Sequence, residues 1–90
     1  MNWSDIMRKF LEKTTRKYVI ATLDNPTLYL KKTPTKNEYC FVDNIEIATK
    51  TNSKALMKKI LKYYYQDSGL NIELVVVPID ITYEIIEEDE

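Results

Sequence analysis

The chain has 90 residues, of which 44% are hydrophobic and 30% are charged, enough for one small domain with a single core. Because it contains no His, one Cys and one Gly, the sequence excludes a Cys/His zinc cluster, a disulfide framework and the glycine-rich loops that bind nucleotide phosphates, and we expect neither a metal nor a cofactor. The net charge of −1 is unevenly distributed: residues 1–40 carry eight Lys/Arg against four Asp/Glu, and residues 41–90 carry five against ten.

The start of the chain lacks the features of a secretory signal. Residues 1–5 have no charged stretch, apolar core or small-residue cleavage site, and no apolar run in the chain reaches the length of a membrane span. We therefore expect a cytoplasmic protein that does not associate with a membrane.

A helix over residues 4–14 is the first predicted element. Its apolar positions recur at helical spacing, and Asp5 stands where a carboxylate complements the helix dipole. This helix either covers one face of a sheet or packs beside a second helix, and the sequence leaves both arrangements open. The apolar positions are Trp3, Ile6, Met7, Phe10 and Leu11.

Three short strands follow and form a meander over residues 17–42. They are rich in β-branched and aromatic residues, and Pro26 and Pro34 stand in the turns between them. Cys40 lies between two aromatic residues of the third strand, where we expect a small buried hydrophobic side chain and not a reactive thiol. The predicted strands are residues 17–23, 28–32 and 38–42.

A second helix is predicted over residues 53–67. Before it, residues 45–49 form either a short strand or an extended lead-in, and the residue pattern does not decide between them. One of three polar residues, 51–53, supplies the N-cap, and Gly69 follows the helix where a left-handed residue is favoured. The apolar face consists of Leu56, Met57, Ile60, Leu61 and Tyr64, opposite Lys54, Lys58, Lys59 and Lys62.

The closing strand, residues 71–86, changes character at Pro78. Before the proline, residues 74–77 are apolar on both faces of the strand, whereas after it apolar and polar residues alternate. The upstream part therefore needs apolar cover on both faces of the sheet, from a helix on one side and from another element or a partner on the other. Residues 87–90 form an acidic tail.

The order of these elements, α-β-β-β-α-β, predicts a single α+β domain over residues 1–90. We expect the three-strand meander and the long C-terminal strand to form one mainly antiparallel sheet, packed by two helices. No internal repeat, linker or low-complexity segment divides the chain.

The sequence contains no pattern typical of a catalytic site. Asp80 and Glu84 point to the same face of the closing strand but lie about 13 Å apart along it. A carboxylate pair for hydrolysis needs a separation of roughly 5 to 9.5 Å. We therefore interpret the chain as a non-enzymatic binding protein.

The tyrosine run at residues 63–65 is the least ordinary local feature. Three consecutive helical positions fan over about 200°, so they do not all face one core. Tyrosine is enriched in binding patches, although it also lines the rims of small cores. The acidic tail also has a simpler interpretation, which is that it keeps the protein soluble. The predicted partner-binding residues are Tyr63 and Tyr65 as exposed aromatic anchors, with Asp80, Glu84, Glu87 and Glu88 as the charged contribution.

Two alternative functions stay open. The lysines of the second helix combine positive charge with nearby tyrosines, as in proteins that bind nucleic acids or nucleotides, but the pI of 5.5 and the acidic tail argue against this function. The other alternative is self-association as a homodimer. A second copy of the chain would cover the edge of the sheet and the part of the closing strand that is apolar on both faces. The nucleic-acid-binding residues would be Lys54, Lys58, Lys59 and Lys62.

Two stretches of the sequence carry a resemblance to a known group of proteins. They are Asn44-Ile45-Glu46-Ile47-Ala48, before the second helix, and Ser53-Lys54-Ala55-Leu56, at its start. Together with the closing apolar strand and a composition typical of an AT-rich genome, they make residues 18–86 resemble small uncharacterised accessory proteins of bacteriophages that infect low-GC Gram-positive bacteria. The resemblance implies that Ala48 and Ala55 are small side chains that let helix and sheet approach closely.

The resemblance implies a role for the protein. Short phage accessory proteins often act by binding and blocking a host protein, including defence nucleases, so the resemblance implies an inhibitor of a host factor in the host cytoplasm, with an anti-defence role. The acidic residues of the tail would then mimic nucleic-acid charge against a basic cleft of that partner.

Overall fold

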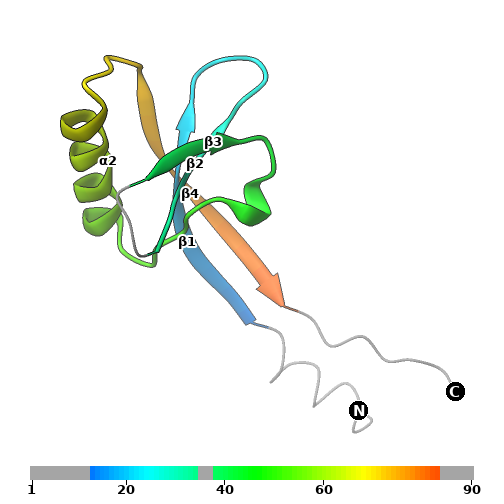
Figure 1. Cartoon of the computed structure of the whole chain (residues 1–90). Coiled ribbons are helices and arrows are strands. Elements are labelled where there is room, and N and C mark those ends of the chain that lie inside the picture. The colour runs from blue at the N-terminus through cyan, green and yellow to red at the C-terminus, as the bar shows by residue number, and fades with distance from the viewer. Residues whose placement is uncertain (1–12, 35–37, 84–90) are drawn as a thin grey trace, which may run out of the picture.

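The computed structural model describes residues 13–34 and 38–83, which form one four-stranded antiparallel sheet and one α-helix (Figure 1). The strands lie in the order β3-β2-β1-β4, so β3 and β4 are the two edges of the sheet. This arrangement confirms the predicted α+β class and the mainly antiparallel sheet. The elements are β1 (Lys13–Thr22), β2 (Tyr29–Lys32), β3 (Tyr39–Val42), the 3₁₀ turn η1 (Ile45–Ile47), α2 (Lys54–Ser68) and β4 (Leu74–Tyr83).

The number of helices differs from the prediction. Helix α2 is present, whereas residues 4–14, predicted as a first helix, fall mostly outside the described residues. The last two of them are strand and not helix, because Lys13 pairs with Tyr83 and Thr14 pairs with Thr82 at the start of β1. In the part of the chain that the structure describes, one α-helix therefore packs the sheet, and η1 is a single additional helical turn.

The first two strands diverge, and a later segment fills the gap between them. β1 and β2 pair at Ala21 and Tyr29, whereas further along, Tyr18 of β1 exchanges two backbone hydrogen bonds with Thr51, at 2.8 and 3.2 Å. The Thr49 N–H donates one hydrogen bond to the Leu30 carbonyl of β2, at 3.1 Å. The segment before α2, for which the sequence allows either a strand or an extended lead-in, is thus the turn η1 followed by a segment that bonds to both β1 and β2.

Helix α2 begins and ends where the sequence predicted, within one residue. The Ser53 Oγ accepts a hydrogen bond from the Leu56 N–H at 3.1 Å, which satisfies one of the free donors of the first turn. Gly69 ends the helix with φ of 65°, a left-handed conformation that strains residues with a Cβ. The prediction of Leu56 on the apolar face is wrong, since this side chain is 49% exposed.

The core lies between α2 and one face of the sheet. Met57 and Tyr64 are the buried residues of the helix, and they pack against buried side chains of β1, β2 and β4. Full burial of side chains of this size stabilises a fold by roughly 1.5–3 kcal/mol each, so this layer makes a large contribution to the stability of the fold. The buried sheet residues in the cluster are Ile20, Leu30 and Leu74.

The closing strand is two-sided before Pro78, as predicted, but it begins later than expected. β4 starts at Leu74, so residues 71–73 are not strand, while residues 84–86 of the predicted strand and the tail at 87–90 lie outside the described residues. Leu74 and Val76 face the core under α2, and Val75 is half-buried on the opposite face.

Beyond the core, β1 and β4 continue as a two-stranded arm, residues 13–17 and 79–83. Figure 1 shows these strands leaving the body of the sheet side by side. One face of the arm is polar, with Thr14 opposite Thr82 and Arg16 opposite Asp80. The other face carries the apolar residues that alternate after Pro78, namely Ile79, Ile81 and Tyr83.

Candidate interaction surface

The three consecutive tyrosines of α2 have three different environments. Tyr64 is buried and packs its ring edge-to-face against Tyr39 and Phe41, with centroids 5.3 and 5.8 Å away. Tyr63 is 48% exposed, which agrees with its predicted place at the surface.

Tyr65 is half-buried and takes part in the fold. Its hydroxyl donates to the Ile72 carbonyl at 2.7 Å and accepts from the Leu74 N–H at 3.1 Å. These two bonds fasten the start of β4 to the end of α2. Tyr65 is therefore not a freely exposed ring, and its hydroxyl is already occupied within the protein.

Of the four acids predicted to bind a partner, the structure describes Asp80. It lies on the arm, where the Arg16 guanidinium donates to both carboxylate oxygens, at 3.0 and 3.3 Å. This bond lowers the pKa of Asp80, and the carboxylate raises the pKa of Arg16. Glu84, Glu87 and Glu88 lie outside the described residues.

Tyr63 and Asp80 belong to different parts of the molecule. Tyr63 is on α2, whereas Asp80 lies four residues beyond Val76, which is about 13 Å along β4 from a core contact of the helix. The structure thus does not bring these two predicted residues together in one patch.

The lysines of α2 form an exposed basic face. All four are exposed, and none makes a hydrogen bond or ion pair with a residue that the structure describes. The exposed ring of Tyr63 follows the last of them directly in sequence, so charge and an aromatic surface occur on the same helix. The four lysines are Lys54, Lys58, Lys59 and Lys62.

A groove between β3 and the end of α2 was not predicted from the sequence. We name it the β3–α2 groove; it has a volume of about 320 Å³. Three of its six lining residues are aromatic, and the large side chain at its rim, Leu70, is 52% exposed. The lining residues are Tyr39, Phe41, Tyr64, Asp67, Ser68 and Leu70.

The groove carries one polar contact between its two walls. The Tyr39 hydroxyl donates to Asp67 Oδ2 at 3.4 Å, across from β3 to α2. Burial of the ring, followed by the negative charge of Asp67, raises the pKa of Tyr39 above that of a free tyrosine. Tyr39 is therefore a neutral donor at physiological pH, and Asp67 supplies the negative charge of the groove.

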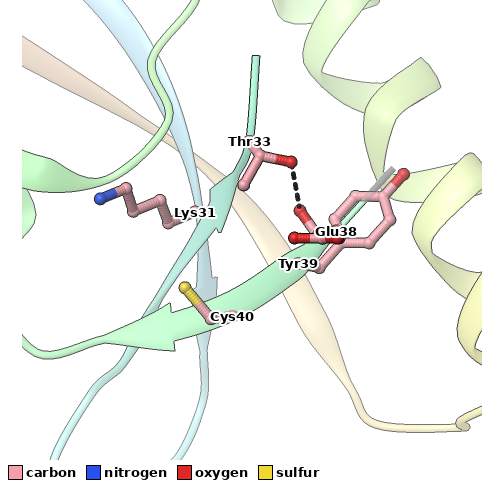
Figure 2. A pocket seen from close by; sticks show the side chains of 5 residues that line it. All are labelled: Lys31, Thr33, Glu38, Tyr39 and Cys40. Carbon is pink, nitrogen blue, oxygen red and sulfur yellow. Dashed lines mark hydrogen bonds between the residues drawn. The ribbon is translucent and has the colours of Figure 1, made fainter. Parts of the chain in front are cut away.

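A second, smaller hollow lies by the turn that joins β2 and β3. Figure 2 shows Lys31 and Cys40 on one side of β3 and the Tyr39 ring on the other, with the Thr33 hydroxyl donating to the Glu38 carbonyl. The hollow measures about 220 Å³. Cys40 is exposed here, so the prediction of a buried side chain is wrong: Tyr39 and Phe41 face α2, and strand alternation turns Cys40 away from the core.

Two further findings concern the described residues alone. They contain no group of three or more His, Cys, Asp or Glu side chains placed to hold a metal ion. Their one α-helix is too short and too polar to cross a membrane.

Comparison of the chain with models of protein families, with curated proteins and with solved structures finds no match. The resemblance to phage accessory proteins therefore stays a hypothesis drawn from the sequence.

Proposed function

We propose that the protein is a non-enzymatic binding module that attaches to another protein through the β3–α2 groove. The observation that carries this proposal is an aromatic groove whose rim exposes 52% of Leu70. Exposed apolar side chains at the rim of an aromatic cavity are typical of protein-binding sites, because a partner that covers them gains the free energy of burial. Tyr63, which is 48% exposed on the same helix, extends the apolar surface of α2.

The class of partner comes from the sequence resemblance. We propose an accessory protein of a phage or other mobile element, which acts in the host cytoplasm and blocks or modulates a host factor such as a defence nuclease. This role needs a binding surface and no catalytic group. The proposal rests on an analogy with the role of short phage accessory proteins.

The test is affinity purification of the tagged chain from phage-infected cells of a low-GC Gram-positive host. We expect one host protein to be retained by the native chain and lost with Leu70→Asp, which places a charge at the rim of the groove. Leu23→Asp is the matched control, because Leu23 is 59% exposed in the turn after β1 and does not line the groove. Equal retention by the native chain and both variants would contradict the proposal.

A second candidate function is nucleic-acid binding by the basic face of α2. It is favoured by the exposure of all four lysines and by the lack of an ion pair between them and any described residue. Phosphate contacts impose a steep loss of affinity with salt, with a slope of roughly −0.7 per contact for single strands on a double-logarithmic plot.

A labelled oligonucleotide titrated at several salt concentrations tests this candidate. If α2 binds phosphates, Lys58→Glu with Lys62→Glu should abolish binding, and the native slope should correspond to about two to four contacts. An absence of binding at low salt would exclude the candidate and leave protein binding.

A further inference from the structure

The two edges of the sheet are protected to different degrees. On β4, Pro78 pairs with Tyr18, and the backbone groups of Tyr18 bond to Thr51, on the side away from β4. Pro78 and every second residue of β4 therefore turn their backbone groups away from β1, to the open edge of the sheet. Pro78 has no N–H to donate there, and the Leu74 N–H is already bonded to the Tyr65 hydroxyl. A strand that approached this part of β4 would therefore form few hydrogen bonds.

The edge at β3 lacks such protection. The Leu30 C=O and the Lys32 N–H are both directed at Thr49. By the alternation of an antiparallel ladder, their cross-strand partners Phe41 and Tyr39 turn N–H and C=O outward. No described residue bonds to these backbone groups, and β3 contains neither Pro nor a charged side chain, the usual means by which proteins blunt an edge.

The open edge and the β3–α2 groove belong to one surface. Tyr39 and Phe41, whose backbone groups point outward, direct their side chains toward Tyr64 of α2. A strand added beside β3 alternates its own side chains, so every second one lies over the groove. The groove volume of about 320 Å³ is at the lower end of the range for small-molecule pockets and suits one or two apolar side chains.

Three acidic side chains border this surface, and one basic side chain, Lys32, lies opposite Tyr39 on β2 and donates to the Thr33 carbonyl. Glu38 and Asp43 flank β3, and Asp67 lies in the groove; all three are exposed, and none forms an ion pair with a described residue. No Lys or Arg is among the residues that line the groove. A partner segment with basic residues is complementary to this surface.

We propose that the β3 edge binds an extended, basic segment of a partner protein as a fifth strand, with an apolar side chain of that segment in the β3–α2 groove. This inference rests on the proposed function, since it specifies how a protein partner is held. Backbone hydrogen bonds to Tyr39 and Phe41 supply affinity, and the groove with its acids selects the sequence of the segment.

A second copy of the chain is a poorer occupant of the same edge. Antiparallel pairing of β3 with β3 of another copy would bring the acids that flank both strands, Glu38 and Asp43, near one another. Like charges close together across strands are destabilising. A basic segment meets these acids with opposite charge.

The probe for the test is a fluorescein-labelled peptide of seven residues that alternates Lys with Val and has Leu at its centre. Anisotropy titrations should give saturable binding to the native chain. Glu38→Lys should weaken binding about fivefold or more, because a peptide with Leu over the groove turns its lysines to the Cys40 face, where Glu38 is exposed. Leu70→Asp should weaken it at least as much, whereas the control Leu23→Asp should bind like the native chain.

Amide hydrogen exchange locates the bound peptide. On binding, the amides of Tyr39 and Phe41 should become at least tenfold better protected, and the amide of Val76 on the other edge should not change. A version of the peptide that is N-methylated on the backbone should fail to bind, because it keeps the side chains and loses the donors.

Three results would overturn the inference. They are equal affinity for a peptide with Glu in place of Lys, binding without protection of the β3 amides, and no binding of the peptide at all. Protection of these amides that rises with protein concentration without peptide would identify a second copy as the occupant. A host protein captured by the native chain and lost with Leu70→Asp would leave the proposed function standing even if the peptide fails.

Discussion

Two tyrosines of α2, Tyr63 and Tyr65, differ in what their hydroxyl groups contact. The Tyr65 hydroxyl bonds to the backbone of Ile72 and Leu74 at the start of β4, whereas Tyr63 is exposed. Tyr65→Phe should lower the free energy of unfolding by about 1–2 kcal/mol, because it leaves the N–H of buried Leu74 without a partner. Urea unfolding measures this change, and Tyr63→Phe is the control, with an expected change within about 0.5 kcal/mol. Equal effects would mean that the Tyr65 bonds do not contribute to stability.

The pair of Arg16 and Asp80 predicts a pH effect on the arm. Hydrogen bonding to Arg16 lowers the pKa of Asp80 in the folded protein, below about 3.9 for an unpaired aspartate. The pair therefore stabilises the arm fully above the unfolded pKa, and its contribution is lost as the pH falls through the folded pKa. A titration of the Asp80 carboxyl by NMR should give this lowered pKa, and Arg16→Gln should return it toward the ordinary value. An unchanged pKa in Arg16→Gln would show that the pair does not form in solution.

Single residues were predicted well where their environment is local. Helical spacing placed Tyr64 on the apolar face of α2, and the structure confirms it. The same spacing does not show that Tyr65 bonds to a backbone group nine residues later. The aromatic neighbours of Cys40 predict a core position for it, but strand alternation turns those neighbours toward α2 and exposes the thiol.

At the scale of an element, α2 depends on its N-cap. Ser53 Oγ accepts the Leu56 N–H, and the first turn has no acidic residue to offset the helix dipole. Ser53→Ala should therefore lower the free energy of unfolding by about 1 kcal/mol, within the range of roughly 0.5–2 kcal/mol for such caps. Thermal or urea unfolding followed by circular dichroism measures it. Asn52→Ala, one residue earlier and also exposed, should have little effect; a loss as large as that of Ser53→Ala would assign the cap wrongly.

A helix or strand is predictable from the sequence where nearby residues determine its bounds, and not where distant residues do. The boundaries of α2 follow from Ser53 and Gly69, which are visible in the sequence. The extra length of β1 is not, because Lys13 and Thr14 become strand through pairing with Tyr83 and Thr82, far away in the chain. The β3–α2 groove was missed for the same reason, since it forms where β3 meets the end of a helix that follows it by many residues.

At the scale of the whole molecule, the sheet has a packed part and an unpacked part. Helix α2 and β4 pack together at Leu74 and Val76, whereas among the described residues the arm beyond Pro78 has its main contacts between its own two strands. Opening the arm exposes little buried apolar area, so it should cost much less free energy than opening the core. The molecule should therefore fluctuate at the arm while the core stays closed.

Amide hydrogen exchange tests this difference on matched positions of one ladder. The amides of Val19 and Val77 belong to the same hydrogen-bonded register of β1 and β4 as those of Thr15 and Ile81, so local bonding is equivalent and only the packing differs. Protection should be at least tenfold lower at Thr15 and Ile81. Arg16→Gln should lower it further in the arm without changing Val19, because the ion pair bridges only the arm strands. Equal protection along the whole ladder would mean that β1 and β4 open as one unit and that the arm is packed in solution by something other than its own two strands.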